Sequence, residues 1–252
     1  MKEKRKEEMI EYVRLKNIVS LEELHEQFNV SMITVRRDVN ELEKEGYITK
    51  VHGGVSFHQS QVRSINQRQH ELLSEKDALG KMAADLVQDG QVIIIDAGST
   101  THHIVKYLKN KKVTIITDAI NVLESALPYS NIQVILTGGR LMRETNSLVG
   151  RQVAEAIKRL NAHWAFIGAT GVSIEKGITN SSIEEADIKR CMVEVAVKKV
   201  LLVDHTKMDV ISMMKFATLN EMDIVITDKP VSDVYREYFD QYGIELKTIL
   251  YQ

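Results

Sequence analysis

The sequence lacks what several classes of protein require. Its 252 residues include one cysteine, Cys191, so neither an intrachain disulfide nor a cysteine-cluster zinc site can form. Cys191 lies in a helical pattern, which predicts a buried, reduced thiol. With two prolines and no low-complexity stretch, no long disordered tail is predicted. No signal peptide opens the chain and no apolar run could span a membrane, so we expect a soluble, cytoplasmic protein with no membrane partner.

The glycine motifs of the common nucleotide-binding folds are also missing. Neither the phosphate loop Gly-x-x-x-x-Gly-Lys-Ser/Thr nor the dinucleotide motif Gly-x-Gly-x-x-Gly occurs. ATP and NAD are therefore disfavoured, and we expect no cofactor. His102 and His103 are adjacent, and their side chains would diverge on a helix. A metal site is therefore not expected.

An excess of positive charge is absent as well. The chain has 33 Lys and Arg against 35 Asp and Glu, a net charge of −2. Acids are nevertheless absent between Gln27 and Arg37, and every charged side chain from Gly46 to His70 is basic. Because phosphate contacts depend on local positive charge, nucleic-acid binding would be confined to these stretches.

Residues 31–42 predict a short amphipathic helix. At 100° per residue one face carries the apolar side chains of Met32, Val35, Val39 and Leu42. Ser31 stands at the N-cap, and Gly46 stands where the helix should end. A helix that buries this face and presents Thr34 and Arg37 is built like a DNA-reading helix.

The flanking residues complete a winged helix–turn–helix over residues 1–57. A first helix is expected from about Lys4 to Leu15, and the capping box Ser20–Glu23 opens a second that runs to about Phe28. Tyr47–Val55 predicts a hairpin with its turn at Gly53–Gly54. The alternative is a helical hairpin that only mediates association.

The predicted DNA contacts come from the third helix and the hairpin. Arg36 or Arg37 could bond guanine edges, and Arg37 is the better placed; the alternative for Arg36 is an ion pair with Glu41 or Glu43. Lys50 and His52 suit phosphate or the minor groove. The predicted DNA-binding residues are Ser31, Thr34, Arg36, Arg37, Lys50 and His52.

After a polar linker at residues 58–74, residues 75–252 predict an α/β domain. Helices are expected at 74–87, 104–108 and 184–197. Near-continuous apolar strands between helices indicate a parallel sheet covered on both faces. The expected strands are 92–95, 113–116, 132–136, 164–167, 200–203, 224–226 and, more weakly, 245–249.

Four of these strands end in aspartate, at the sheet edge where α/β proteins bind ligands. Aspartates often only stabilise the start of a helix, and we favour that role for Asp118 and Asp228. Asp96 differs because a glycine and three hydroxyl residues follow it, which is typical of an anion site at a helix N-terminus. The predicted loop residues are Asp96, Gly98, Ser99, Thr100 and Thr101.

Other candidates could reach the same edge. Arg140 follows a strand and could bring a guanidinium to an anion. Asp204 and Lys207 place an acid and a cation three residues apart after another strand. Lys189 is a further candidate, although a solvated ion pair with Glu185 on one helix face is its default interpretation.

These motifs, taken in order, resemble the DeoR-type regulators of bacterial sugar metabolism over nearly the whole chain. The resemblance implies a repressor whose second domain, similar to ribose-5-phosphate isomerase, senses a phosphorylated sugar without converting it. Many relatives have Asn where this chain has Asp118, which adds charge. The segments that carry the resemblance are Thr34–Asp38, Leu42, His52–Gly54, Asp96–Thr101, Ser147–Gly150, Gly168–Gly171, Glu184–Arg190 and Asp204–Lys207.

The resulting hypothesis is a repressor of a carbohydrate or polyol operon. A homo-oligomer, dimer or tetramer, would bind double-stranded operator DNA and leave it when a phosphorylated sugar or polyol binds. The alternatives are a sugar-phosphate isomerase-like enzyme fused to a DNA-binding head, and an activator or architectural DNA protein.

Overall fold

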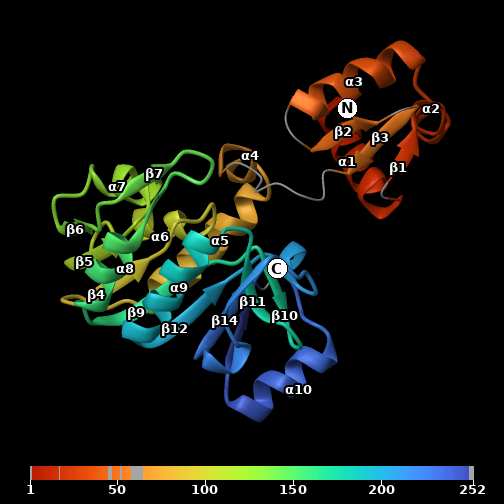
Figure 1. Cartoon of the computed structure of the whole chain (residues 1–252). Coiled ribbons are helices and arrows are strands. Elements are labelled where there is room, and N and C mark those ends of the chain that lie inside the picture. Colours follow the sequence, from red (N-terminus) through yellow and green to blue (C-terminus); the bar gives the residue numbers. More distant parts are fainter. Residues whose placement is uncertain (1, 17, 45–46, 52, 58–64, 250–252) are drawn as a thin grey trace. The chain divides into compact units, whose positions relative to one another are not determined.

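The computed structural model describes residues 2–16, 18–44, 47–51, 53–57 and 65–249. The chain divides into two compact units, Met1–Arg63 and Ser64–Gln252 (Figure 1). Gly46, His52 and residues 58–64 of the predicted linker lie outside the described residues.

The first unit is a winged helix–turn–helix, as predicted. Its strands form one antiparallel sheet in the order β1-β3-β2. Strand β1 was not predicted, and it explains Gly54: a Cβ there would lie 2.3 Å from the carbonyl oxygen of Val19 in β1. The elements are α1 (Lys2–Lys16), β1 (Ile18–Ser20), α2 (Leu21–Phe28), α3 (Met32–Lys44), β2 (Ile48–Val51) and β3 (Gly54–Phe57).

The apolar stripes of the three helices meet in one small core. Met9 and Val13 of α1 are fully buried with Leu24 of α2, and the predicted α3 face packs on them. A buried carboxylate also fixes α3: Asp38 Oδ2 accepts hydrogen bonds from Arg5 on α1, at 2.8 Å from Nε and 2.7 Å from a terminal nitrogen. Burial of a charge is tolerated here because it is paired.

The second unit is built on one sheet of seven parallel strands, and all seven predicted strands are present. Their order is β15-β14-β12-β9-β4-β5-β6, so the chain runs outward in both directions from the central pair β4 and β9. This reversal of strand order is the point where α/β sheets bind ligands, outside the carboxyl ends of the strands. The strands are β4 (Val92–Ile95), β5 (Val113–Thr117), β6 (Ile132–Leu136), β9 (Ala162–Ile167), β12 (Ala196–Leu202), β14 (Ile224–Thr227) and β15 (Glu245–Thr248).

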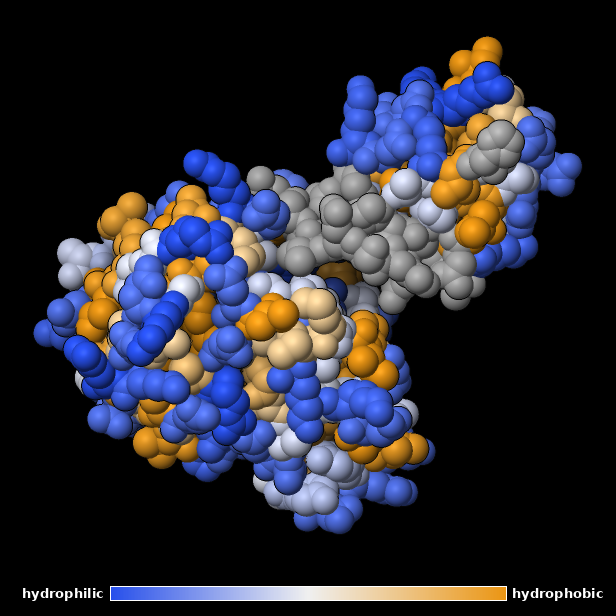
Figure 2. Space-filling view, viewed as in Figure 1, coloured by the Kyte–Doolittle hydropathy of each residue, from blue (hydrophilic) through white to orange (hydrophobic). Residues whose placement is uncertain are grey.

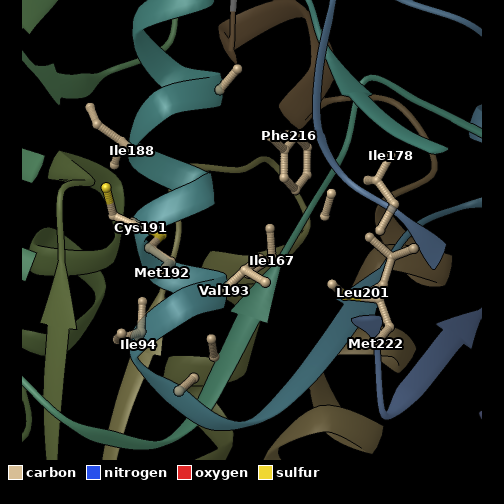
Figure 3. Close-up of a cluster of buried hydrophobic side chains, with 14 of the residues drawn as sticks. Ile94, Ile167, Ile178, Ile188, Cys191, Met192, Val193, Leu201, Phe216 and Met222 are labelled. Carbon is tan, nitrogen blue, oxygen red and sulfur yellow. The ribbon is translucent and has the colours of Figure 1, made fainter. Parts of the chain in front are cut away.

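Helices cover both faces of the sheet. Helices α5, α6 and α7 bury their apolar residues against one face, and α8, α9 and α10 against the other. Successive strand residues alternate between faces. Ile94 packs with Met192 of α9 (Figure 3). Ile93 and Ile95 belong to the cluster on the opposite face, which includes buried residues of α5 and α6. Cys191 is buried in the α9 layer as predicted, and burial raises the pKa of its thiol. The helices are α4 (Ile65–Gln69), α5 (Leu73–Asp85), α6 (Ile104–Tyr107), α7 (Ile120–Ala126), α8 (Arg151–Lys158), α9 (Ile183–Val195) and α10 (Asp233–Tyr242).

Some elements differ from those predicted. Helix α4 lies within the range assigned to the linker, and its Ile65 is buried. Helix α9 ends at Val195 because the chain enters β12 directly. Several short pieces were not predicted: β7 (Arg140–Met142) with β8 (Ser147–Val149), the small sheet β10 (Gly171–Ser173), β11 (Gly177–Asn180) and β13 (Met214–Ala217), and the 3-10 turns η1 (Thr101–His103), η2 (His205–Lys207) and η3 (Leu219–Glu221).

Candidate functional site

In the first unit, the start of α3 has the predicted cap. Ser31 Oγ accepts a hydrogen bond from Thr34 N at 3.3 Å and lies 3.0 Å from the Thr34 hydroxyl. Ser31 and Thr34, two of the predicted DNA contacts, therefore also order the first turn of the helix.

The two arginines of α3 are exposed, and the acids suggested for Arg36 pair with other residues. Glu41 lies 3.5 Å from Lys6, and Glu43 pairs with Lys50 at 2.5 Å. Arg37 has a side chain 58% exposed, with its Nε 3.7 Å from Asp38. The Lys50 pair offsets part of the positive charge predicted for the wing.

In the second unit, Asp96 lies at the centre of the sheet edge. It follows β4 directly and is fully buried, and its Oδ2 accepts a hydrogen bond of 2.8 Å from the backbone N–H of Gly168, after β9. Lys189 of α9 donates to the same oxygen and, at 3.2 Å, to the carbonyl of Gly168. The other oxygen of Asp96, Oδ1, is buried without a hydrogen-bond partner.

Lys189 therefore lies beside Asp96, and its default interpretation as a solvated partner of Glu185 was wrong. It is 6% exposed and pairs with Asp96, whereas Glu185 on the same helix is buried and accepts hydrogen bonds from Ser147 and Asn180. The i, i+4 spacing predicted a solvated pair because the sequence alone does not reveal that this face of α9 is covered.

The loop after Asp96 is compact and largely buried. Thr101 Oγ1 donates to the Asp96 carbonyl at 3.0 Å, and a Cβ on Gly98 would lie 2.6 Å from that hydroxyl oxygen. Ser99 and Thr100 are buried between them. The predicted helix after the loop is only the turn η1 followed by the four residues of α6. An anion here would depend on side-chain cations more than on a long helix dipole.

A second charged group surrounds Asp204, after β12. Its Oδ1 accepts from Thr206, and Lys207 Nζ lies 4.0 Å from its Oδ2. Burial alone would raise the pKa of Asp204, but Lys207 and the Thr206 hydrogen bonds hold it below its usual value. Lys76 of α5, which the sequence did not single out, is 3% exposed, and burial lowers its pKa to about 8 despite the attraction of Asp204.

Asp118, which follows β5, has an unusual environment for an ionisable group. Its side chain is buried, its Oδ1 has no hydrogen-bond partner, and α7 begins at Ile120 with Ala119 at the N-cap and no side-chain cap. Burial and the nearby Asp96 raise the pKa of Asp118 to about 7. The predicted role at a helix start is therefore wrong. Asp228 has a local bracing role instead, since its Oδ1 accepts from the His205 backbone N–H at 2.5 Å.

Both parts of the chain match models of one family. The DeoR-like helix–turn–helix domain matches residues 5–61, and the DeoR C terminal sensor domain matches residues 71–229. This chain belongs to the DeoR family. The transcriptional regulator IolR of Bacillus subtilis is 35% identical over 97% of this chain and 98% of its own. The repressor GlcR of the same organism is 32% identical over 94% and 93%.

The DeoR-family chain is thus a DNA-binding transcriptional regulator with a sensor domain. A solved ribose 5-phosphate isomerase A from Methanocaldococcus jannaschii aligns with 53% of this chain and 53% of its own, at 21% identity and a TM-score of 0.39.

In the part of the regulator that the structure describes, no helix is long and apolar enough to cross a membrane. The same residues contain no group of three or more His, Cys, Asp or Glu side chains suited to a metal ion.

Two further side chains of the regulator bear on the predicted site. Arg140 is exposed, and its guanidinium donates to both oxygens of Glu184, at 2.9 and 2.7 Å, in an ion pair on the surface. Asn121 of α7 was not predicted, yet its Nδ2 donates to the carbonyl of Gly98 at 3.1 Å and fixes the loop. No local motif marks Asn121, because its partner lies in another strand-end loop.

The buried Asp118 of this regulator should make its stability depend on pH. Its folded pKa of about 7 lies above the ordinary value of 3.8, so its contribution is fully present below 3.8 and is lost as the pH rises through 7. We expect Asp118→Asn to raise the thermal unfolding midpoint at pH 8, with the gain shrinking toward pH 5. A gain that is equal at every pH would contradict the assignment.

Proposed function

We propose that this regulator represses its operator as a homodimer or tetramer and that a phosphorylated sugar or polyol, bound at the sheet edge, releases it. It would act in the cytoplasm on double-stranded DNA, contacted through Ser31, Thr34, Arg36, Arg37 and the wing. His52 stays part of this proposal although it lies outside the described residues. The effector would lie beside Asp96, Lys189, Asp204 and Lys207.

The observation that carries the effector proposal is the half-satisfied carboxylate of Asp96. Buried polar atoms nearly always have hydrogen-bond partners, and an unpaired one costs about 1–3 kcal/mol. Asp96 Oδ2 has two donors while Oδ1 has none. A hydroxyl of a sugar or polyol would satisfy Oδ1, and Lys189 already fixes the orientation of the carboxylate.

The two lysines near Asp204 favour a phosphorylated effector. Lys76 is buried, and both the Asp204 carboxylate and the Lys207 ammonium act on it. The charged groups that act on Lys76 are the carboxylates of Asp204 and Glu71 and the cations of Lys207 and Arg68, so the group counted together with Lys76 has one positive charge in excess. A phosphate monoester carries about −1.5 to −2 charges near neutral pH and would offset this excess.

Release requires that the effector bind more tightly to a state in which the DNA-binding units do not match the operator. In a dimer, two α3 helices would enter successive major grooves of a roughly palindromic site. Binding of the effector to the sensor domain would therefore release the DNA if it changed the spacing or orientation of the two α3 helices, without any change within α3 itself.

Thermal unfolding against a panel of pentose, hexose and polyol phosphates, each paired with its unphosphorylated form, tests the proposal. A phosphorylated compound should raise the unfolding midpoint and also displace the regulator from its operator. The same incubations, analysed for new sugar phosphates, test the isomerase alternative. Conversion of one sugar phosphate into another would show that the second unit is an enzyme and not only a sensor. Stabilisation by the unphosphorylated forms alone would contradict the phosphate assignment.

Lys76→Met tests the contact with the phosphate group separately from the contacts with the rest of the effector. The variant replaces a buried ammonium with an apolar side chain of similar length, and the Asp204 carboxylate keeps Lys207 and its Thr206 hydrogen bond, so we expect a stable fold. Calorimetry should show a loss of about tenfold or more in affinity for the phosphorylated effector, as expected for one charge-assisted contact. Lys81→Met, on the exposed side of the same helix, is the control and should change nothing.

A further inference from the structure

The exposed face of α3 carries one large apolar side chain that the packing of the unit does not use. Ile33, in the first turn, is 81% exposed, more than any other large hydrophobic residue described. Single exposed apolar residues are common, and Figure 2 shows many scattered over the faces in view. Exposure alone therefore assigns no role to Ile33.

The position of Ile33 on the helix makes it informative. Counted at 100° per residue, Ile33, Arg37 and Asn40 lie within one narrow sector opposite the buried residues, and all three are exposed. The hydrogen bonds of Ser31 to Thr34 order the turn that contains Ile33. The exposed sector thus presents an alkyl group, a guanidinium and a carboxamide on one ordered helix.

Each of these groups has a matching partner in the major groove of DNA. Guanidinium pairs with guanine and carboxamide with adenine, whereas the 5-methyl of thymine is the apolar group that the groove offers. We propose that Ile33 reads a thymine of the operator through its 5-methyl group. This inference rests on the proposed function, in which α3 occupies the major groove.

The test compares a methyl deletion on the DNA with a side-chain deletion on the protein. The probe is the duplex that the full-length wild-type chain selects from a random library, with its thymines replaced one at a time by deoxyuridine, which lacks only the methyl. If the wild-type chain selects no duplex, or if Arg37→Ala binds the selected duplex as tightly as the wild type, the proposed use of α3 fails before Ile33 is tested.

We expect one thymine in each half-site at which deoxyuridine weakens wild-type binding about fourfold, the value of one buried methyl group. Ile33→Ala removes the contact in both half-sites, so it should weaken binding to the thymine duplex by about the square of that factor, about sixteenfold, and be insensitive to deoxyuridine at that position alone. Ile18→Ala removes another exposed isoleucine of the same unit, on β1, and should keep the full methyl dependence.

Two results would overturn the inference. One is an Ile33→Ala variant that retains the wild-type response to deoxyuridine at every thymine. The other is an Ile33→Ala variant that binds the thymine duplex and its deoxyuridine derivatives equally weakly, while the wild type shows no thymine at which loss of the methyl group lowers affinity. Circular dichroism of both isoleucine variants checks that the first unit is folded, and Ile33→Val, which shortens the side chain by one methylene, should lie between wild type and Ile33→Ala.

Discussion

Arg37→Ala is expected to abolish specific operator binding while leaving effector binding and folding unchanged. The guanidinium is 58% exposed and makes no hydrogen bond to Asp38 Oδ1, which lies 3.7 Å away and has no hydrogen-bond partner, while Arg5 holds Asp38 Oδ2, so its removal breaks no buried hydrogen bond. A bidentate arginine–guanine contact contributes about 1–3 kcal/mol to discrimination. Two half-sites in a dimer double that contribution, so the loss of affinity should reach about a hundredfold or more.

Arg36→Ala is the matched comparison for Arg37→Ala. Arg36 is also exposed on α3 but lies about 100° away around the helix, so only a modest, sequence-independent loss is expected. Binding curves against the selected duplex and a scrambled duplex separate the two effects. Equal affinities of Arg37→Ala and wild type for the selected duplex would show that another face of α3 reads DNA.

The sheet could be predicted from the sequence because its strands are buried on both faces. Ile93, Ile94 and Ile95 are all fully buried, and such continuous apolar runs between helices are specific to parallel sheets. The Asp96 edge followed from the same argument, since the carboxyl ends of parallel strands meet. The short strands β10, β11 and β13 escaped prediction because three or four residues carry too little periodicity.

The contacts within the site could not be predicted, because they join residues distant in sequence. Lys189 and Asp96 are 93 positions apart, and the helical spacing of Lys189 suggested the wrong partner. Lys76 resembles an ordinary helical lysine until its burial is known. The ion pair of Arg140 with Glu184, 44 positions away, could not be predicted either, and the predicted contact of Arg140 with an anion stays a prediction.

Asp96→Asn is expected to give a regulator that stays on its operator in the presence of the effector. The amide keeps the size of the carboxylate and can still accept from Gly168, but it loses the charge that pairs with Lys189 and binds hydroxyls strongly. Asp96→Ala is a poorer test, because it leaves the buried Lys189 ammonium unpaired. Such a change costs about 3–5 kcal/mol and risks unfolding the sensor domain.

Operator titrations of Asp96→Asn with and without the effector identified by the sugar-phosphate panel measure this expectation. Affinity without effector should match the wild type, and the effector-induced loss of affinity should fall by about tenfold or more, since one charged hydrogen bond is weakened. Asp223→Asn, where the carboxylate pairs with Lys198 and Lys199 at the amino end of β14, is the control, because that end of the sheet carries no proposed effector contact. Normal induction of Asp96→Asn, with Asp223→Asn also normal, would place the effector away from the β4 edge and leave the unpartnered Oδ1 of Asp96 without a ligand role.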